Sequence, residues 1–320
     1  MAFFARDLAK FGGTQLKPKL IIILGPTAVG KSELALELAT CIDAELVNAD
    51  SQQIYRYLDI GTGKPSPADR ARVAHHLIDI VDPDEEFNAA LYRRLATQSI
   101  AQIHGRKKQV IVCGGTGLYL KALTQGLFEG PGQDAQIRQV LETQIDSEGL
   151  AALHLQLSRI DPSAATRIHA NDRQRLIRAL EVFQLTGKRL SQWQKEHRFQ
   201  ERPFDVMKIG LNRERSELYD RINRRSERMV EDGLLAEVRS VVAMGYGLAL
   251  KPLRSVGYRQ MGQVLLGQQE LLGAIEEMKQ ETRRLAKRQL TWFGADKDVR
   301  WFDPNEKTEI VEAAKKYFSI

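Results

Sequence analysis

The sequence contains little cysteine and no long apolar run, and each absence excludes a class of protein. Its two cysteines, Cys41 and Cys113, stand far apart in apolar stretches. We therefore expect buried free thiols, and neither a disulfide framework nor a Cys/His zinc site. No apolar stretch approaches the ~20 residues that a membrane span needs, and residues 1–7 lack the hydrophobic region of a secretory signal. We expect a cytoplasmic protein with no membrane partner.

A large excess of charge of one sign is also missing. The formal net charge of +6 is compatible with a nucleic-acid partner but does not indicate one by itself. The hydrophobic content of 43% is ordinary for a globular protein. A chain of 320 residues can bury a large core, and we expect it to form two domains.

The first stretch that carries chemistry is the glycine-rich segment 25–32, Gly-Pro-Thr-Ala-Val-Gly-Lys-Ser. It follows the apolar run 20–24, which predicts a buried strand. It opens into residues 33–39, where Leu34 and Leu38 lie one helical turn apart. A strand, a glycine loop and a helix in this order match the G-x-x-x-x-G-K-[ST] pattern of a phosphate-binding loop.

The residues of this loop suit the binding of an anion. Gly25 and Gly30 let the backbone curl so that its N–H groups converge on a phosphate, and the helix N-terminus adds partial positive charge. Lys31 can reach a phosphate oxygen, and the Ser32 hydroxyl is placed to hold Mg²⁺. The loop therefore predicts a di- or triphosphate ligand, without saying which one.

Two further strands end in polar or glycine-rich residues. Residues 44–50 predict a strand that ends at Asp50, and residues 109–113 predict a buried strand that runs into 114–117, with Thr116. Ligands of parallel α/β sheets lie beyond the carboxyl ends of the strands, so both side chains are expected beside the phosphate loop. Two alternatives remain open: a helix N-cap for Asp50, and a plain strand-to-helix turn for Thr116.

The rest of the sheet is predicted from shorter runs. Residues 77–81 are expected to form a third strand, preceded by His75 and His76 in structural roles, because adjacent histidines on a strand point to opposite faces. Residues 205–211 indicate a return to the sheet, and residues 299–302 a last strand.

The chain is expected to divide into four parts. A loose lead-in covers residues 1–18, and the α/β core covers 19–129. A helical insertion covers 130–203, because leucines and alanines recur there at helical spacing among many charges. Residues 204–320 return to the core and add C-terminal helices.

One arginine stands in an apolar row. Leu218, Ile222, Arg225 and Met229 follow one another at spacings of four, three and four residues, so Arg225 faces the core side of a helix. Arginine is almost never buried unpaired, and it must meet an internal carboxylate or a ligand phosphate. Arg221, one turn earlier, points to nearly the same place.

Other basic residues gather in three places. Arg175 and Arg178 share a helix face with Gln174, residues 254–259 form a loop with two arginines and a tyrosine, and 283–292 is a basic helix. These surfaces could follow a sugar–phosphate backbone. An ordinary solvated face is the alternative.

Several of these segments together resemble the tRNA dimethylallyltransferase family. The resemblance rests on the loop at 25–32, on Asn-Ala-Asp-Ser-Gln-Gln-Ile-Tyr at 48–55 with Asp-Ile-Gly-Thr-Gly-Lys at 59–64, on Gly-Gly-Thr-Gly-Leu-Tyr at 114–119, on Asn-Asp at 171–172 with Arg175 and Arg-Ala-Leu-Glu at 178–181, and on Ser-Val-Gly-Tyr-Arg-Gln at 255–260. It implies a P-loop NTPase-like parallel sheet with an inserted helical domain, in the bacterial form without a zinc finger. It also implies transfer of a prenyl group from dimethylallyl diphosphate to N6 of adenosine 37, next to the anticodon of tRNA.

The resemblance also implies roles for individual residues. Asp50 would be the general base, Thr116 its partner at the target base, and Arg225 a ligand of the diphosphate. The diphosphate set is Gly25, Thr27, Ala28, Val29, Gly30, Lys31, Ser32 and Arg225, with Mg²⁺ on Ser32. The tRNA set is Asp50, Ser51, Gln52, Gln53, Thr116, Arg138, Gln174, Arg175, Leu176, Ile177, Arg178, Arg254, Tyr258 and Arg259. The enzyme is expected to act as a monomer on the anticodon stem-loop. Arg173 departs from the proline of many members and leaves the loop before Gln174 undefined.

Other classes of protein share part of these features. A small-molecule kinase would use the same loop with Asp79 or Asp82 on magnesium, but it would not explain the basic insertion or two glycine-rich strand ends. A prenyltransferase acting on free adenine nucleotides would lack the basic helical additions. A non-catalytic RNA-binding module would leave Lys31 and Arg225 unexplained.

Overall fold

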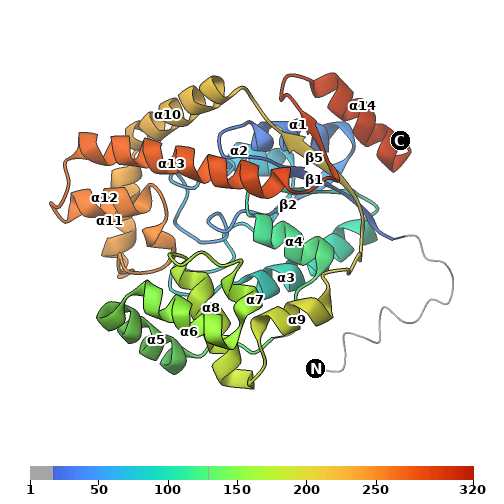
Figure 1. The fold of residues 1–320 in the computed structure, drawn as a ribbon. Coiled ribbons are helices and arrows are strands. Elements are labelled where there is room, and N and C mark those ends of the chain that lie inside the picture. The colour runs from blue at the N-terminus through green and yellow to red at the C-terminus, as the bar shows by residue number, and fades with distance from the viewer. Residues whose placement is uncertain (1–16, 129) are drawn as a thin grey trace. The chain divides into compact units, whose positions relative to one another are not determined.

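The computed structural model describes residues 17–128 and 130–320. The chain forms two compact units (Figure 1). The first comprises the chain up to Thr124 and the segment Arg202–Ile320, and the second is Gln125–Glu201. Most of the expected lead-in at 1–18 lies outside the described residues. In the part of the chain that the structure describes, no helix combines the length and apolarity that a membrane crossing requires.

The first unit is built on a parallel sheet of six strands in the order β3-β2-β4-β1-β5-β6. The strands are β1 (Lys19–Leu24), β2 (Ala44–Asn48), β3 (His75–His76), β4 (Gln109–Cys113), β5 (Asp205–Leu211) and β6 (Val299–Phe302). The central strands are continuous apolar runs because helices cover both faces of the sheet. Leu20, Ile22 and Leu24 of β1 face one core, and Ile21 and Ile23 face the other.

Helices form the layers on the two faces. They are α1 (Lys31–Cys41), α2 (Pro67–Arg72), α3 (Ala89–Gly105), α4 (Gly117–Gln125), α10 (Arg215–Glu231), α11 (Leu234–Ala243), α12 (Tyr258–Leu265), α13 (Leu271–Gly294) and α14 (Lys307–Phe318), with a 3₁₀ turn at Pro252–Arg254. One core collects α3, α4, α11 and α12, and the other collects α1 and α14. The helix α10 packs along α13 (Figure 1), and both helices border the carboxyl edge of the sheet through the contacts described below.

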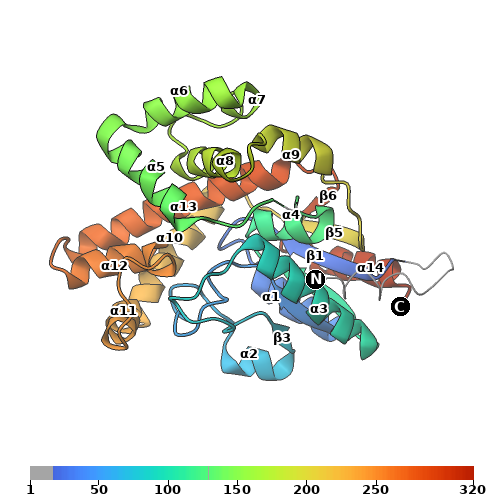
Figure 2. The ribbon, with the colours of Figure 1, turned by 90° about the horizontal axis from the view of Figure 1, so that it is seen from below.

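The second unit consists of helices around its own apolar core. They are α5 (Ala135–Glu148), α6 (Leu150–Ile160), α7 (Pro162–Ala165), α8 (Arg173–Thr186) and α9 (Leu190–His197), and α5, α6 and α8 pack on one another (Figure 2). The described residues of this unit contain no strand, as expected for 130–203. Asp172 caps α8 by accepting from the Arg175 N–H at 3.1 Å, so Arg173 begins the helix.

Two expectations about the first unit are wrong. Strand β3 is His75–His76 itself and not residues 77–81, because Leu77 and Asp79 adopt φ of +63° and +57°, which a strand cannot contain. The cysteines are not buried thiols, since Cys41 is exposed and Cys113 is partly exposed. The histidines do have structural partners: His75 Nδ1 lies 2.7 Å from the Val73 carbonyl oxygen, and His76 Nε2 lies 2.7 Å from Glu45.

Two carboxylates of the second unit, Asp161 and Glu181, are buried, and Glu181 receives the charged partners. Glu181 is 0% exposed and accepts from the Asp134 N–H at 2.9 Å, from Arg138 at 2.7 Å and from Arg178 at 2.7 Å. Burial alone would raise the pKa of Glu181, but the bonds from Arg138 and Arg178 outweigh it and the pKa is lowered. Two of the arginines assigned to tRNA therefore hold this unit together.

We expect Glu181→Gln to destabilise the protein by about 2 kcal/mol near neutral pH, because charge-assisted hydrogen bonds are lost while both arginine side chains stay about one-third exposed. A lowered folded pKa contributes stability above the unfolded value of 4.5, and this contribution is lost as the pH falls through the folded pKa. Urea unfolding at neutral and acidic pH measures the difference in unfolding free energy between the wild type and Glu181→Gln, and this difference should be smaller in acid. An equal difference at both pH values would contradict the assignment.

Candidate active site

The phosphate loop is shaped by a close approach between two strands. Gly25 has φ +141°, and a Cβ there would lie 2.5 Å from the Leu211 carbonyl oxygen at the end of β5. The loop then turns through Ala28, at φ +64°, into the first turn of α1. Its backbone curls as the glycine pattern predicts, and the N-terminus of α1 faces the carboxyl edge of the sheet.

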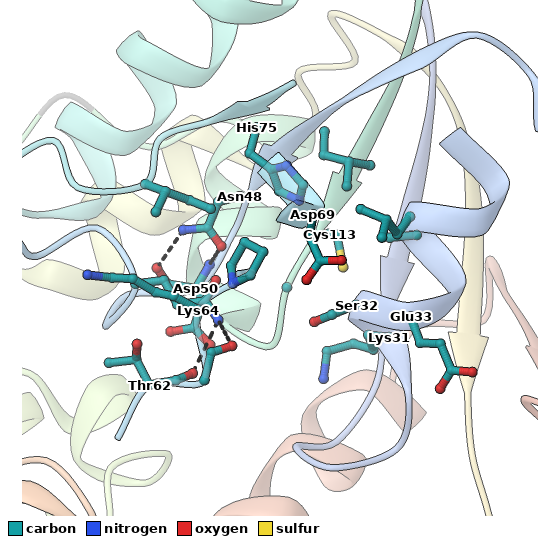
Figure 3. Close-up of a pocket in the computed structure, with 18 of the residues that line it drawn as sticks. Lys31, Ser32, Glu33, Asn48, Asp50, Thr62, Lys64, Asp69, His75 and Cys113 are labelled. Carbon is teal, nitrogen blue, oxygen red and sulfur yellow. Dashed lines mark hydrogen bonds between the residues drawn. The ribbon is translucent and has the colours of Figure 1, made fainter. Parts of the chain in front are cut away.

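Lys31 and Ser32 open onto a cavity of about 450 Å³, and in Figure 3 they lie across it from Asp50 and Lys64. The Lys31 ammonium donates to the Pro26 carbonyl oxygen at 2.7 Å. Burial lowers the pKa of Lys31 to about 8, and the nearby Asp50 carboxylate opposes part of that shift. The site thus holds a cation at a cost in solvation, which a bound phosphate would offset.

Asp50 and Thr116 lie at the same crevice, as the strand ends predicted. The Asp50 N–H donates to Asn48 at 3.0 Å, and the Asp50 carboxylate accepts from the Gln52 N–H at 2.8 Å. The Thr116 hydroxyl oxygen accepts from the Ser51 N–H at 2.9 Å. The Asp50 carboxylate caps a turn and not a helix, and the side chains come from the ends of two neighbouring strands.

A second cavity, of about 510 Å³, adjoins the first. Asp50, Thr27, Arg225 and Gln289 line both, whereas Lys31 and Ser32 line only the first of the two and Thr116 only the second. We call the first cavity the phosphate chamber and the other the second chamber. The Asp50 carboxylate and the Arg225 guanidinium lie between the two chambers. Such an arrangement suits two ligands that meet at Asp50.

Arg225 occupies the apolar row of α10 as predicted and is partly buried. Its Nη1 donates to the Thr27 hydroxyl at 3.3 Å. Within the described residues, no carboxylate lies within ion-pair distance of its guanidinium, so the internal salt bridge weighed above is absent there. Burial lowers the pKa of Arg225, and Arg221 donates to the Ala28 carbonyl oxygen at 2.9 Å. Arg221 and Arg225 of α10 thus both reach the phosphate loop.

Gln289 of α13 is a site residue that the sequence did not single out. Its amide oxygen accepts from the Thr27 N–H at 2.9 Å, and its amide nitrogen donates to the Gly115 carbonyl oxygen at 3.0 Å. It joins the phosphate loop to the second glycine-rich strand end. The only signal in the sequence was an uncharged amide within the basic run 283–292.

The residues assigned to tRNA in the first unit separate into two groups. Arg254 and Arg259 are exposed and line the second cavity, and Arg259 also pairs with Glu277 at 2.7 Å. Gln53 is tied to the Thr62 and Gly63 carbonyl oxygens. Tyr258 is 0% exposed, so its ring is enclosed by the protein, and its assignment to tRNA stays a prediction that rests on the motif.

The residues assigned to tRNA in the second unit also separate. Gln174 and Arg175 are exposed on α8, and Arg175 pairs with Asp172 at 3.3 Å. The side chains of Leu176 and Ile177 lie in the helical core, and their assignment to tRNA stays a prediction that rests on the motif. Arg138 and Arg178 bind Glu181, as described above.

The Ser32 hydroxyl is the donor that the phosphate-loop pattern assigns to a metal ion. The described residues contain no cluster of three His, Cys, Asp or Glu side chains able to hold a metal. Ser32 opens into the cavity beside Lys31, and a P-loop serine needs no such cluster because Mg²⁺ takes most of its ligands from phosphate oxygens and water. The residues fit Mg²⁺ that arrives with a phosphate ligand.

A parallel sheet with a phosphate loop at its carboxyl edge, and a strand-end carboxylate between two chambers, defines a P-loop α/β protein for a phosphorylated substrate and a second substrate. The model of the IPP transferase family matches residues 53–296. The chain belongs to this family.

Curated relatives and solved structures agree with this family assignment. The chain is 50% identical over 305 residues to tRNA dimethylallyltransferase 2 of Syntrophus aciditrophicus, covering 95% of this chain and 98% of that one. It is 51% identical over 303 residues to tRNA dimethylallyltransferase of Geobacter sulfurreducens, covering 94% and 97%. The structure of a full-length tRNA isopentenylpyrophosphate transferase from Bacillus halodurans matches with a TM-score of 0.71 at 40% identity, covering 95% and 97%. A eukaryotic dimethylallyltransferase described as acting on tRNA matches with a TM-score of 0.79 at 28% identity, covering 94% and 80%.

We expect the affinity of the protein for inorganic diphosphate to fall as the pH rises through about 8, because Lys31 loses its proton there in the empty site and the anion binds the protonated form. In Lys31→Arg the charge persists, so this decline should disappear. Calorimetric titration at pH values on either side of 8 measures both proteins. The same decline in Lys31→Arg would show that another group titrates.

Proposed function

We propose that this protein transfers the dimethylallyl group of dimethylallyl diphosphate to the exocyclic N6 of adenosine 37, next to the anticodon of tRNA, and releases diphosphate. The observation that supports the proposal most strongly is the position of Asp50 and Arg225 on both chambers. The names of the relatives, which describe dimethylallyl transfer and action on tRNA, supply the substrate classes.

The donor half of the reaction rests on positive charge around the phosphate loop. The bond between the allylic carbon and the diphosphate oxygen breaks, and its electron pair stays on the diphosphate. Lys31, Arg225 and the loop N–H groups would stabilise the charge that develops there. With Ser32 as its protein ligand, Mg²⁺ would supply further positive charge to the diphosphate oxygens.

The acceptor half needs a base because the N6 lone pair is delocalised into the adenine ring and makes the amine a poor nucleophile. Asp50 would accept the N6 proton as the new carbon–nitrogen bond forms, and such assistance is typically worth ~10²–10⁴-fold. The Thr116 hydroxyl accepts from the Ser51 N–H, which leaves its own hydrogen for a ring nitrogen of the adenine. The base would have to leave the stack of the anticodon loop to reach Asp50.

The tRNA would approach through the second chamber, where Arg254 and Arg259 are exposed. These arginines suit the phosphates of the anticodon stem-loop. We expect the enzyme to act as a monomer in the cytoplasm, together with its tRNA substrate.

A kinase mechanism is disfavoured by the state of the carboxylates that it would use. Asp79 accepts from Lys64 at 2.5 Å and from Arg70 at 2.6 Å, and Asp82 accepts from Arg56 at 2.9 Å. The cations hold the pKa of Asp79 below its ordinary value despite burial. Both carboxylates are thus committed to ion pairs inside the fold.

Labelled dimethylallyl diphosphate, incubated with unmodified tRNA, AMP or ATP, tests the proposal. We expect label to enter tRNA only, and we expect Asp50→Asn to lower turnover by at least about 10²-fold because the N6 proton loses its acceptor. The affinity for tRNA should stay within about twofold, since Asp50 makes few of the contacts that hold the backbone.

The exposed Asp84 provides a matched control, and Asp84→Asn should turn over like the wild type. Near-normal turnover by Asp50→Asn would remove Asp50 from the role of base. Transfer of label to AMP or ATP would replace tRNA with a free nucleotide as the acceptor.

Salt dependence separates the two substrates. Each neutralised phosphate of a single strand contributes a slope of about −0.7 to log K against log salt, so charge reversal at Arg254 and Arg259 together should flatten the tRNA slope by about 1.4. Diphosphate affinity should hardly change, because these residues do not line the phosphate chamber. Fluorescence titrations over a range of salt measure both quantities.

The control for this pair is charge reversal at Lys315 and Lys316, which are exposed on α14. This control should keep the slope of the wild type. An unchanged slope in the Arg254 and Arg259 variant would show that tRNA does not bind at the second chamber.

A further inference from the structure

One carboxylate outside both chambers binds a whole turn of the backbone. Glu237 of α11 accepts from the N–H groups of Asp59 and Ile60 at 3.0 and 2.8 Å, and from that of Gly61 at 3.3 Å. Its Oε1 also accepts from the Tyr258 hydroxyl at 2.6 Å. Glu237 lines neither chamber, so the reaction itself gives no reason for this carboxylate.

Tyr258 completes the attachment of the turn. Its ring is 0% exposed, and a Cβ at Gly61 would lie 2.5 Å from its Cε2 atom, so only glycine lets the turn approach the ring. Burial and the Glu237 carboxylate raise the pKa of Tyr258, which keeps the phenol protonated as a donor. The turn is thus held both by hydrogen bonds and by packing.

The same turn supports the guanidinium of Arg225. Gly63 has φ +60°, and a Cβ there would lie 2.1 Å from Arg225 Nη2, so the guanidinium rests on the backbone of Gly63. The Thr62 and Gly63 carbonyl oxygens accept from Gln53 at 3.2 and 3.1 Å, on the chamber side. Any shift of the turn therefore moves the surface against which Arg225 packs.

We propose that Glu237, with Tyr258, is a positioning residue that sets Arg225 over the phosphate loop by holding the turn 59–63. The inference rests on the proposed function for the identity of the donor, but the diphosphate group alone suffices to test it. The single polar contact of Arg225 given by the structure, to Thr27, is long at 3.3 Å. Its placement therefore depends on the surface beneath it.

Calorimetric binding of inorganic diphosphate, with Mg²⁺ present, tests the inference on the full chain. We expect Glu237→Gln to weaken binding by about tenfold, because an amide leaves one or two of the turn N–H groups without an acceptor and small misplacements of binding groups are costly. Tyr258→Phe keeps the three backbone bonds and should weaken binding only about threefold. The affinity for tRNA should not change in either variant.

A double-mutant cycle separates positioning from general destabilisation. If Glu237 acts through Arg225, Glu237→Gln should cause no further loss of diphosphate affinity in an Arg225→Ala background. The exposed Glu312 serves as the matched control, and Glu312→Gln should bind like the wild type. All proteins are compared below their unfolding midpoints, and Tyr258→Phe carries the test if Glu237→Gln does not fold.

Wild-type affinity in Glu237→Gln, or in Tyr258→Phe where the former does not fold, would overturn the inference. So would an equal loss with and without Arg225. A wild-type protein that binds diphosphate but transfers no prenyl group to tRNA would instead refute the proposed function and leave the inference standing.

Discussion

The parallel register of the sheet is the constraint on which the rest of this protein depends. Because β2, β4 and β1 are neighbours, their carboxyl ends deliver Asp50, Thr116 and the phosphate loop to one edge. The loop can reach that edge because residue 25 is a glycine, since a Cβ there would lie 2.5 Å from the Leu211 carbonyl oxygen. The site is therefore a consequence of strand order, and the helices α10 and α13 complete it through Arg225 and Gln289.

The carboxyl edge of the sheet contains buried positive charge. Burial lowers the pKa of both Lys31 and Arg225, so the fold without a ligand carries cations that it solvates poorly. Elsewhere in the same unit Lys64, with a side chain 2% exposed, has the carboxylates of Asp59 and Asp79 within 2.7 Å. Lys31 and Arg225 have no such carboxylate partner among the ion pairs of the described residues, which supports the proposal that an anionic ligand neutralises them.

Sequence patterns predicted the strands and helix faces that depend on neighbouring residues in the chain. The apolar runs correctly predicted strands β1, β2, β4, β5 and β6. The spacing of the apolar residues around Arg225 predicted the face of α10 on which it lies. The predicted strand at 77–81 is absent because Leu77 and Asp79 adopt positive φ, which the apolar pattern of this run does not reveal. Gln289 was missed because its partner Thr27 lies 262 residues away. The burial of the Tyr258 ring was not foreseen because a motif gives residue types without their burial.

The segment Asp-Ile-Gly-Thr-Gly-Lys at 59–64 contributes to the family resemblance, yet much of its content is structural. Gly61 is required by the Tyr258 ring and Gly63 by the Arg225 guanidinium. Lys64, with a side chain only 2% exposed, joins Asp59 to Asp79. Two glycines required by sterics and one lysine held in an ion pair thus fix the backbone against which the Arg225 guanidinium packs. A sequence signature can thus identify an enzyme through residues that support the site and do not themselves react.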